Sequence, residues 1–210
     1  MGMLAPARRT LLGLLVLAPA AFVAPPPARA ETDTAQAAAF IKQTGQEMAT
    51  LIGGAPTAAE KRRRMQPFLD RVVDVDGVAR FCLGRHWRQA TGAQQEAYLK
   101  LFHRVLLNNV VSRMGDYQHT EIHVIIGQPE AREDGIHVPT ILERTGNPPA
   151  RVTWVVSLDG TPRIVDVMAE GTSLRLTMRS DYNAFLARHG DSIDALIDAL
   201  REQTDQAVAG

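Results

Sequence analysis

Apolar residues recur at helical spacing in the first part of the chain. From Ala35 onward they fall on one side of a helix that Gly53 ends. Thr57 and Glu60 then have the spacing of a capping box, which predicts a second helix that runs to about Val73. The apolar positions of these two helices are Phe40, Ile41, Met48, Leu51, Ile52, Met65, Phe68, Leu69, Val72 and Val73.

Two more helices are predicted before the pattern changes. Asp76 is a candidate cap for a short helix that Gly84 ends. Thr91 and Gln94 repeat the capping-box spacing ahead of a longer helix to about Met114. The apolar positions of this longer helix cover a broad side, which indicates packing against a large surface. They are Tyr98, Leu99, Phe102, Val105, Leu106, Val110 and Met114.

After residue 117 the spacing becomes that of strands. Apolar and polar residues alternate in residues 122–126, 136–142, 152–158 and 164–169. Short connections join these stretches, and Asp159-Gly160 is typical of a tight turn. We therefore predict four consecutive strands in an antiparallel sheet.

The last part of the chain is predicted to be helical again. Residues 172–189 fit both an alternating and a helical pattern, and their length favours a helix that Gly190 ends. Asp191 or Ser192 can cap a final amphipathic helix. Helices, then strands, then helices make an α+β domain.

The N-terminus has the pattern of a removable export signal. Arg8 and Arg9 precede an apolar run from Leu11 to Val23, and a Pro-rich stretch leads to Ala28-Arg29-Ala30. The run is shorter than the roughly 20 residues of a membrane-spanning helix. We expect cleavage after Ala30, with residues 1–30 as the signal and residues 31–210 as one periplasmic domain. The arginine pair also partly fits a twin-arginine signal, so both export routes stay open.

Charge and cysteine content narrow the class of protein. The chain has 23 basic and 23 acidic residues, and loss of Arg8, Arg9 and Arg29 with the signal leaves a net charge of −3. A nearly neutral domain argues against nucleic acid as a partner. Cys82 is the only cysteine, so the domain forms no internal disulfide, and its apolar neighbours predict a buried thiol.

Catalytic signatures are missing from the sequence. It contains no G-x-S-x-G, no Gly-rich phosphate loop, no H-E-x-x-H and no cysteine pair. His119, Glu121 and His123 alternate onto one strand face, which we interpret as solvated, with a metal or proton-transfer role as the alternative. We assign no catalytic residue, no metal and no cofactor.

The densest charge run is Lys61-Arg62-Arg63-Arg64 in the second predicted helix. We expect it to leave the apolar stripe free and to form a solvated helix face. The alternative is a basic patch that docks transiently to an acidic partner or an anionic membrane surface.

Several motifs along the chain match one family. They are Gly84-Arg85-His86-Trp87 followed by the Gln94-containing helix, residues 159–174 from Asp-Gly-Thr-Pro to Glu-Gly-Thr-Ser-Leu, Arg179-Ser180-Asp181-Tyr182, and Gly190 with Ile193-Asp194-Ala195-Leu196-Ile197. In these motifs the chain resembles the MlaC family of periplasmic phospholipid-binding proteins, also called the toluene-tolerance family. Two departures are Val110, where the family commonly has an aromatic residue, and Thr172, where it has valine.

The resemblance implies both an architecture and a function. The fold would be a curved antiparallel sheet packed against helices, enclosing an apolar cavity that holds lipid acyl chains. The protein would be a monomeric carrier, not an enzyme, that moves phospholipid between an inner-membrane ABC transporter complex and an outer-membrane lipoprotein complex. Residues expected to line or border the cavity are Trp87, Phe102, Leu106, Val110, Tyr117, Trp154, Val156, Met168, Thr172 and Met178.

Three alternatives stay open. The same fold could carry a hopanoid or another lipid. The pocket could serve a small periplasmic enzyme that uses His119, His123 or Asp166. The protein could also be a structural adaptor with a dry core that carries no lipid.

Overall fold

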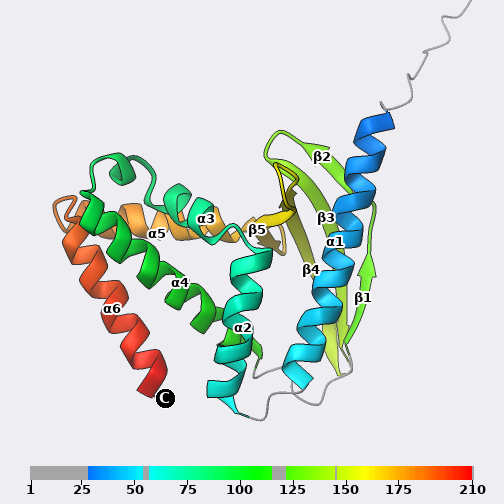
Figure 1. Cartoon of the computed structure of the whole chain (residues 1–210), viewed down its shortest axis with the longest axis horizontal. Coiled ribbons are helices and arrows are strands. Elements are labelled where there is room, and N and C mark those ends of the chain that lie inside the picture. Colours follow the sequence, from blue (N-terminus) through cyan, green and yellow to red (C-terminus); the bar gives the residue numbers. More distant parts are fainter. Residues whose placement is uncertain (1–27, 54–56, 115–121, 145, 210) are drawn as a thin grey trace, which may run out of the picture.

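The computed structural model describes residues 28–53, 57–114, 122–144 and 146–209 (Figure 1). Its helices are α1 (Ala28–Gly53), α2 (Ala58–Val72), α3 (Val75–Leu83), the 3₁₀ helix η1 (Gly84–Arg88), α4 (Gly92–Met114), α5 (Leu174–Arg188) and α6 (Ile193–Ala209). Its strands are β1 (Ile122–Ile126), β2 (Glu130–Arg132), β3 (Gly135–Arg144), β4 (Asn147–Ser157), β5 (Arg163–Ala169) and β6 (Thr172–Ser173). Helices precede and follow the strands, so the predicted α+β class is confirmed.

The strands form one antiparallel sheet in the order β1-β3-β4-β5-β6. The strand β2 also pairs with β3, so β1 and β2 share one edge of that strand. The four longer strands form the predicted meander. The prediction of four strands misses β2 and β6, because elements of three and two residues are too short to show an alternating pattern.

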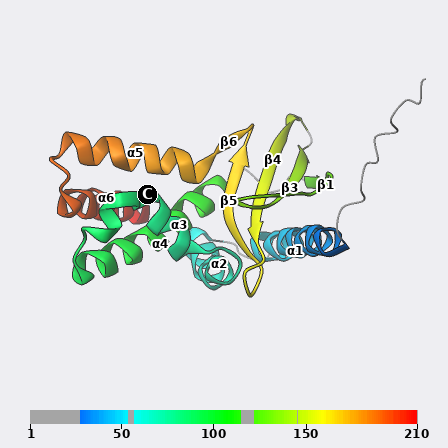
Figure 2. The same ribbon diagram turned by 90° about the horizontal axis from the view of Figure 1, so that it is seen from above.

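The sheet is curved, as the view from above shows (Figure 2). The register between β4 and β5 shifts at Val155 and Val156, and that between β3 and β4 shifts between Leu142 and Arg144. Shifts of this kind bend a strand and increase its twist. The curvature gives the sheet an inner face, defined here as the face that packs against α1, and an outer face.

Side-chain caps fix most of the helix starts where the sequence places them. The Thr57 hydroxyl accepts the Glu60 amide at 3.1 Å. At the start of α4, Gln94 N–H donates to the Thr91 hydroxyl at 3.2 Å, and its side chain accepts the Thr91 amide at 3.0 Å. The prediction that Asp76 caps α3 is wrong: Asp74 does so, since its carboxylate accepts the Gly77 amide at 3.0 Å.

The helices form two groups around the sheet (Figure 1). The helices α3 to α6 pack on one another at one side of the sheet, around the buried side chains of Leu83, Tyr98, Phe102, Leu186 and Leu196. The long helix α1 crosses the inner face, and α2 stands between α1 and α4. Within the described ranges, the hydrophobic core is divided into three clusters.

Candidate functional site

The inner face of the sheet is fully covered at one end. Ile136, Val138 and Val156 are at most 7% exposed and pack against Ala37 and Ile41 in the first half of α1. Strand register places Ile136 opposite Val156, so their side chains project from the same face. This end is an ordinary hydrophobic core between a helix and a sheet.

The rest of the protein covers the inner face less completely toward the end where β3 ends and β4 begins. Trp154 is half-buried, and its indole N–H donates to the hydroxyl of the buried Thr140 at 3.1 Å. One register step further, Leu142 and Val152 are half-buried, and Val124 opposite Leu142 is 51% exposed. We call these last three residues the open end of the inner face, since they are apolar but incompletely covered by protein.

A second apolar surface lies between α1, α2 and α4. Its buried side chains are Met65, Phe68, Leu69, Val72 and Val111, and we call this group the α2 cluster. Four partly buried apolar residues extend the cluster from α1 and α4: Met48, Leu51, Leu107 and Val110. Phe40 and Val73 touch both the α2 cluster and the sheet cluster. The second half of α1 therefore packs on α2, whereas its first half packs on the sheet.

The ten residues predicted to line a cavity are distributed over several clusters. Trp87, Phe102, Leu106 and Met178 belong to the core of α3 to α6, Val110 packs on the α2 cluster, and Trp154 and Val156 lie on the inner face. Met168 is half-buried and pairs with Thr153 and Ser173, Thr172 is exposed in β6, and Tyr117 lies outside the described residues. Their contact with lipid stays a prediction.

The open end is a set that the prediction left out. Val124, Leu142 and Val152 lie in stretches that the alternating pattern predicts as strands, but no sequence signal says which end of a strand a helix leaves uncovered. That depends on where α1 turns away from the sheet, which is set by tertiary packing.

The motif at residues 159–174 has a structural role in the fold. The Asp166 carboxylate is buried on the outer face and accepts the amides of Val167 at 2.8 Å and Arg175 at 3.1 Å. The hydroxyl of Ser173 donates to it at 2.5 Å, and the Arg175 guanidinium approaches to 3.4 Å. Ser173 in turn caps α5 by accepting the Leu176 amide at 3.1 Å. Asp166 is thus occupied in joining β5 to α5.

The groups considered for chemistry do not assemble into a site. His119 and Glu121 lie outside the described residues, and His123 is exposed. Among the residues that the structure describes, no three His, Cys, Asp or Glu side chains are placed to hold a metal ion. Cys82 is fully buried, and burial raises the pKa of its thiol to about 12, with the nearby Asp166 as a smaller cause. The predicted buried thiol is confirmed.

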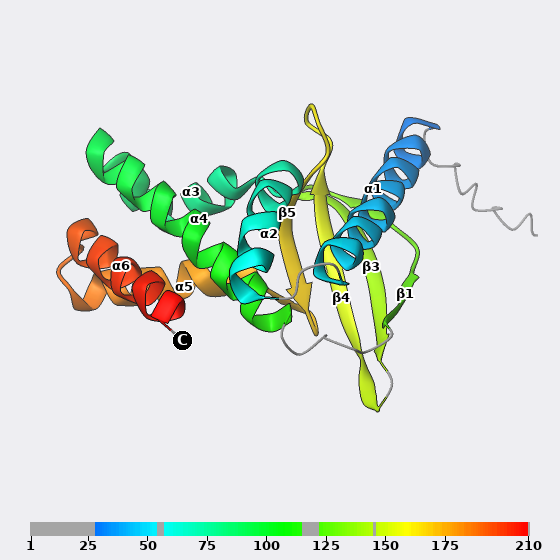
Figure 3. The ribbon, with the colours of Figure 1, turned by 60° about the horizontal axis from the view of Figure 1, so that its bottom comes forward.

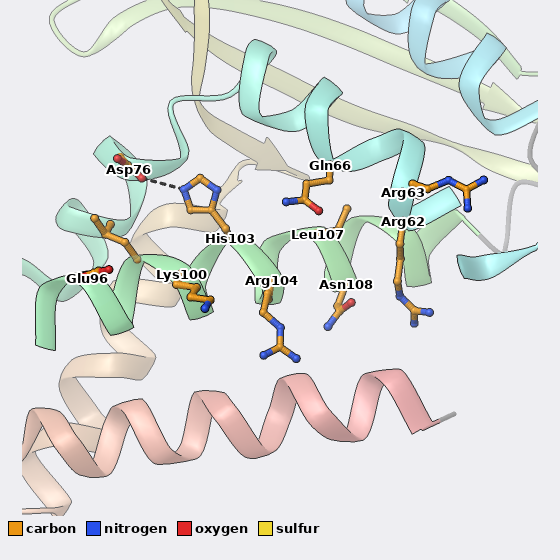
Figure 4. A pocket seen from close by; sticks show the side chains of 11 residues that line it. Arg62, Arg63, Gln66, Asp76, Glu96, Lys100, His103, Arg104, Leu107 and Asn108 are labelled. Atoms are coloured by element: carbon orange, nitrogen blue, oxygen red, sulfur yellow. Dashed lines mark hydrogen bonds and ion pairs between the residues drawn. The ribbon is translucent and has the colours of Figure 1, made fainter. Parts of the chain in front are cut away.

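A groove of about 740 Å³ runs along α2, α3 and α4 and is lined by charged side chains together with Leu99 and Leu107 (Figure 4). His103 lies in it between two carboxylates, 3.0 Å from Asp70 and 2.8 Å from Asp76. Its charged lining is mainly basic and consists of Arg62, Arg63, Lys100, Arg104, Asp76 and Glu96. The basic side chains of this lining favour acidic groups.

The basic run at the start of α2 is only partly the solvated face that we expected. Arg63 is exposed and lines the groove. Lys61, by contrast, is only 5% exposed and lies on the same helical stripe as Met65 and Phe68. The expectation that the run leaves the apolar stripe free is therefore wrong for Lys61, because a spacing of four residues places it directly before Met65 on that stripe.

None of the helices in the described ranges has an apolar stretch of the length and hydropathy needed to cross a bilayer. The fold resembles that of a phospholipid-binding protein from Ralstonia solanacearum, whose structure was determined in complex with a phospholipid. The TM-score is 0.73 at 18% sequence identity, and the match covers 82% of this chain and 98% of the other. The MlaC protein family matches residues 39–202, which is most of the sequence and includes every strand of the sheet. The chain therefore belongs to the MlaC family.

Proposed function

We propose that this protein is a periplasmic carrier that holds the acyl chains of a phospholipid against the open end of the inner face. The observation that supports the proposal is the incomplete cover of Val124, Leu142 and Val152, which are apolar side chains on the inner face of the sheet. Membership of the MlaC family and the phospholipid in the Ralstonia protein support the choice of ligand. The Trp154 ring, between the covered and open ends, would contact the deepest part of the chains.

The need for a carrier follows from the hydrophobic effect. At about 0.8 kcal/mol per CH₂, transfer of one roughly 16-carbon chain from a membrane to water costs on the order of 13 kcal/mol. A second chain roughly doubles this barrier. A protein that offers an apolar surface in place of the membrane removes most of it, and no bond has to be made or broken.

The route of transport is the finer part of the proposal. Export by the signal in residues 1–30 would place the domain of residues 31–210 between the two bacterial membranes. There it would exchange lipid with an inner-membrane ABC transporter complex and an outer-membrane lipoprotein complex. The basic lining of the groove along α2 and α4 provides a surface on which an acidic partner could dock.

An enzymatic role has less support. The hydrogen bonds of Asp166 tie it to the backbone and to Ser173. Of the two histidines considered for catalysis, His123 is exposed on the edge strand.

The proposal is tested by the lipid that the protein carries and by a charge placed at the open end. Protein purified from the periplasm is extracted, and the lipid is identified by mass spectrometry. Leu142→Asp is expected to abolish lipid capture, because an isolated carboxylate among acyl chains is strongly disfavoured. The matched control is Ile141→Asp, the next residue along β3, whose side chain is 38% exposed on the outer face.

Each outcome bears on a different alternative. Phospholipid in the wild type and in the control, but not in Leu142→Asp, supports the proposal. A hopanoid in place of phospholipid would support the same binding site with a different lipid as its ligand. Normal capture by a folded Leu142→Asp would remove the open end as the acyl-chain site, and absence of lipid from the wild type would favour the adaptor.

A further inference from the structure

The inner face changes from open to covered in successive rows of paired residues. Leu142 lies in the row nearest the turn between β3 and β4, and it is half-buried. Thr140 and Val152 share the next row, and the fully buried Val138 shares the third row with Trp154. In Figure 3 the ends of β3 and β4 beside their turn extend past α1. Trp154 therefore lies at the boundary between the covered core and the open end.

The Trp154 ring is held at this boundary by two hydrogen bonds in series. Its indole N–H donates to the Thr140 hydroxyl at 3.1 Å, and that hydroxyl donates to the Val152 carbonyl oxygen at 2.9 Å. Thr140 is only 3% exposed, so water competes little for these bonds. Trp154 belongs to the row of Val138, but its N–H reaches Thr140 in the row nearer the turn. The ring thus leans from the covered core toward the open end.

Thr140 is a polar residue within an apolar surface. Its neighbours on the inner face are Ile126 on β1, Val152 on β4, and Val138 and Leu142 along β3 itself. A buried hydroxyl is costly unless it is hydrogen-bonded, and valine would have nearly the same shape without that cost. Packing alone therefore does not account for the hydroxyl. Its effect is to fix a bulky aromatic ring in one orientation.

We infer that Trp154 is the end wall that limits the length of acyl chain held at the open end, an inference that rests on the proposed function. Chains that lie on Leu142 and Val152 extend inward along the strands until they meet the indole. Beyond the indole, Val138 is already packed in the core beneath α1, so a longer chain gains no further apolar contact. Each CH₂ that leaves the membrane without such contact lowers capture about fourfold. The site therefore selects lipids by chain length, with Thr140 as a positioning residue.

The experiment measures which chain lengths the protein captures. Wild type and variants are offered vesicles of dipalmitoleoyl-, dioleoyl- and dieicosenoylphosphatidylglycerol in equal amounts, and the captured lipids are quantified by mass spectrometry. Trp154→Leu is expected to raise the captured ratio of the longest to the shortest lipid at least about fourfold, the effect of one further CH₂. Val152→Phe places a wall one row nearer the turn, and it is expected to lower the same ratio by at least about fourfold.

Two variants of Thr140 separate the position of the ring from simple packing. Thr140→Val keeps the shape but removes the acceptor of the indole N–H, so the ratio is expected to rise by a smaller factor than in Trp154→Leu. Thr140→Ser keeps the hydroxyl and is expected to keep the wild-type ratio. The matched control is Thr153→Ala, one residue before Trp154 in β4, whose side chain projects from the outer face. It is expected to leave the ratio unchanged.

The ratio of captured lipids tests the inference, and the total amount captured tests the proposed function. Opposite shifts in Trp154→Leu and Val152→Phe support the end wall. An unchanged ratio in both variants, with normal total capture, would overturn the inference and leave the proposed function intact. If Trp154→Leu does not fold, an unchanged ratio in Val152→Phe alone overturns it. Equal shifts in Thr140→Val and Thr140→Ser would refute the positioning role of the hydroxyl. Failure of the wild type to capture any of the three lipids would refute the proposed function itself.

Discussion

Replacement of Asp166 by Asn tests whether this buried carboxylate stabilises the fold or is held ready for chemistry. One carboxylate oxygen, Oδ1, accepts the backbone amides of Val167 and Arg175. The other, Oδ2, accepts the Ser173 hydroxyl and lies 3.4 Å from the Arg175 guanidinium. Asn keeps the first oxygen and replaces the second by an amide nitrogen, which repels the guanidinium and forces the hydroxyl to turn.

The expected loss can be worked out from these contacts. Asp166 is 6% exposed, so solvent screens the pair with Arg175 only weakly. Removal of one partner from a buried ion pair costs about 3–5 kcal/mol. We expect Asp166→Asn to lose about 3 kcal/mol of unfolding free energy, and Asp166→Ala about 5 kcal/mol because two backbone amides also lose their acceptor. For a domain of this size, 3 kcal/mol lowers the melting temperature by about 6–12 °C.

The assay is urea unfolding followed by circular dichroism, with lipid capture measured well below the transition. The control is Asp159→Asn in the exposed turn before β5, which is expected to change stability by no more than about 0.5 kcal/mol. Lipid capture by folded Asp166→Asn should equal that of the wild type, because Asp166 lies on the outer face opposite Val155. An Asp166→Asn variant within about 1 kcal/mol of the wild type would refute the reasoning.

Two further predictions concern the thiol and one glycine. The Cys82 thiol is fully buried, and its pKa is raised to about 12. It should therefore stay protonated at pH 8 and react with Ellman's reagent only after the protein is unfolded. Rapid reaction of the native protein would contradict its burial. Gly135→Ala should lose more than about 1 kcal/mol in urea unfolding, because φ is +134° and a Cβ would lie 2.8 Å from the Val156 carbonyl oxygen. Gly171→Ala, with φ of +81° and nothing within 4 Å, should lose less, and equal losses would rule out the steric cause.

The helix starts were predictable because their signals are local. The capping boxes at Thr57 and Thr91 place the partner residue three positions away, so the sequence alone contains both halves of the interaction. The local signal did not distinguish Asp76 from Asp74, because both have the same side chain and lie two residues apart. Packing of Val75 in the core favours the helix start at Asp74. The order and class of the elements followed from periodicity in the same way.

The site was less predictable because periodicity identifies apolar faces but not the elements that cover them. Phe102 and Val156 both lie on correctly predicted faces, yet the first packs among helices and the second under α1. The burial of Lys61 was missed because a run of four charges suggests solvent, while the helical phase of a single residue decides its position. These outcomes depend on contacts between segments far apart in the sequence.

Under the proposed function, lipid bound at the open end of the inner face would link the stability of the protein to its occupancy. A ligand that binds only the folded state raises the unfolding free energy by RT ln(1 + [L]/Kd), so the loaded carrier resists unfolding better than the empty one. Polar substitutions around Val124 would then weaken the loaded form and leave the empty form nearly unchanged. Substitutions at Val138, beneath α1, would weaken both forms alike. The difference in melting temperature between the loaded and the empty protein would thus measure how much stability the bound lipid contributes.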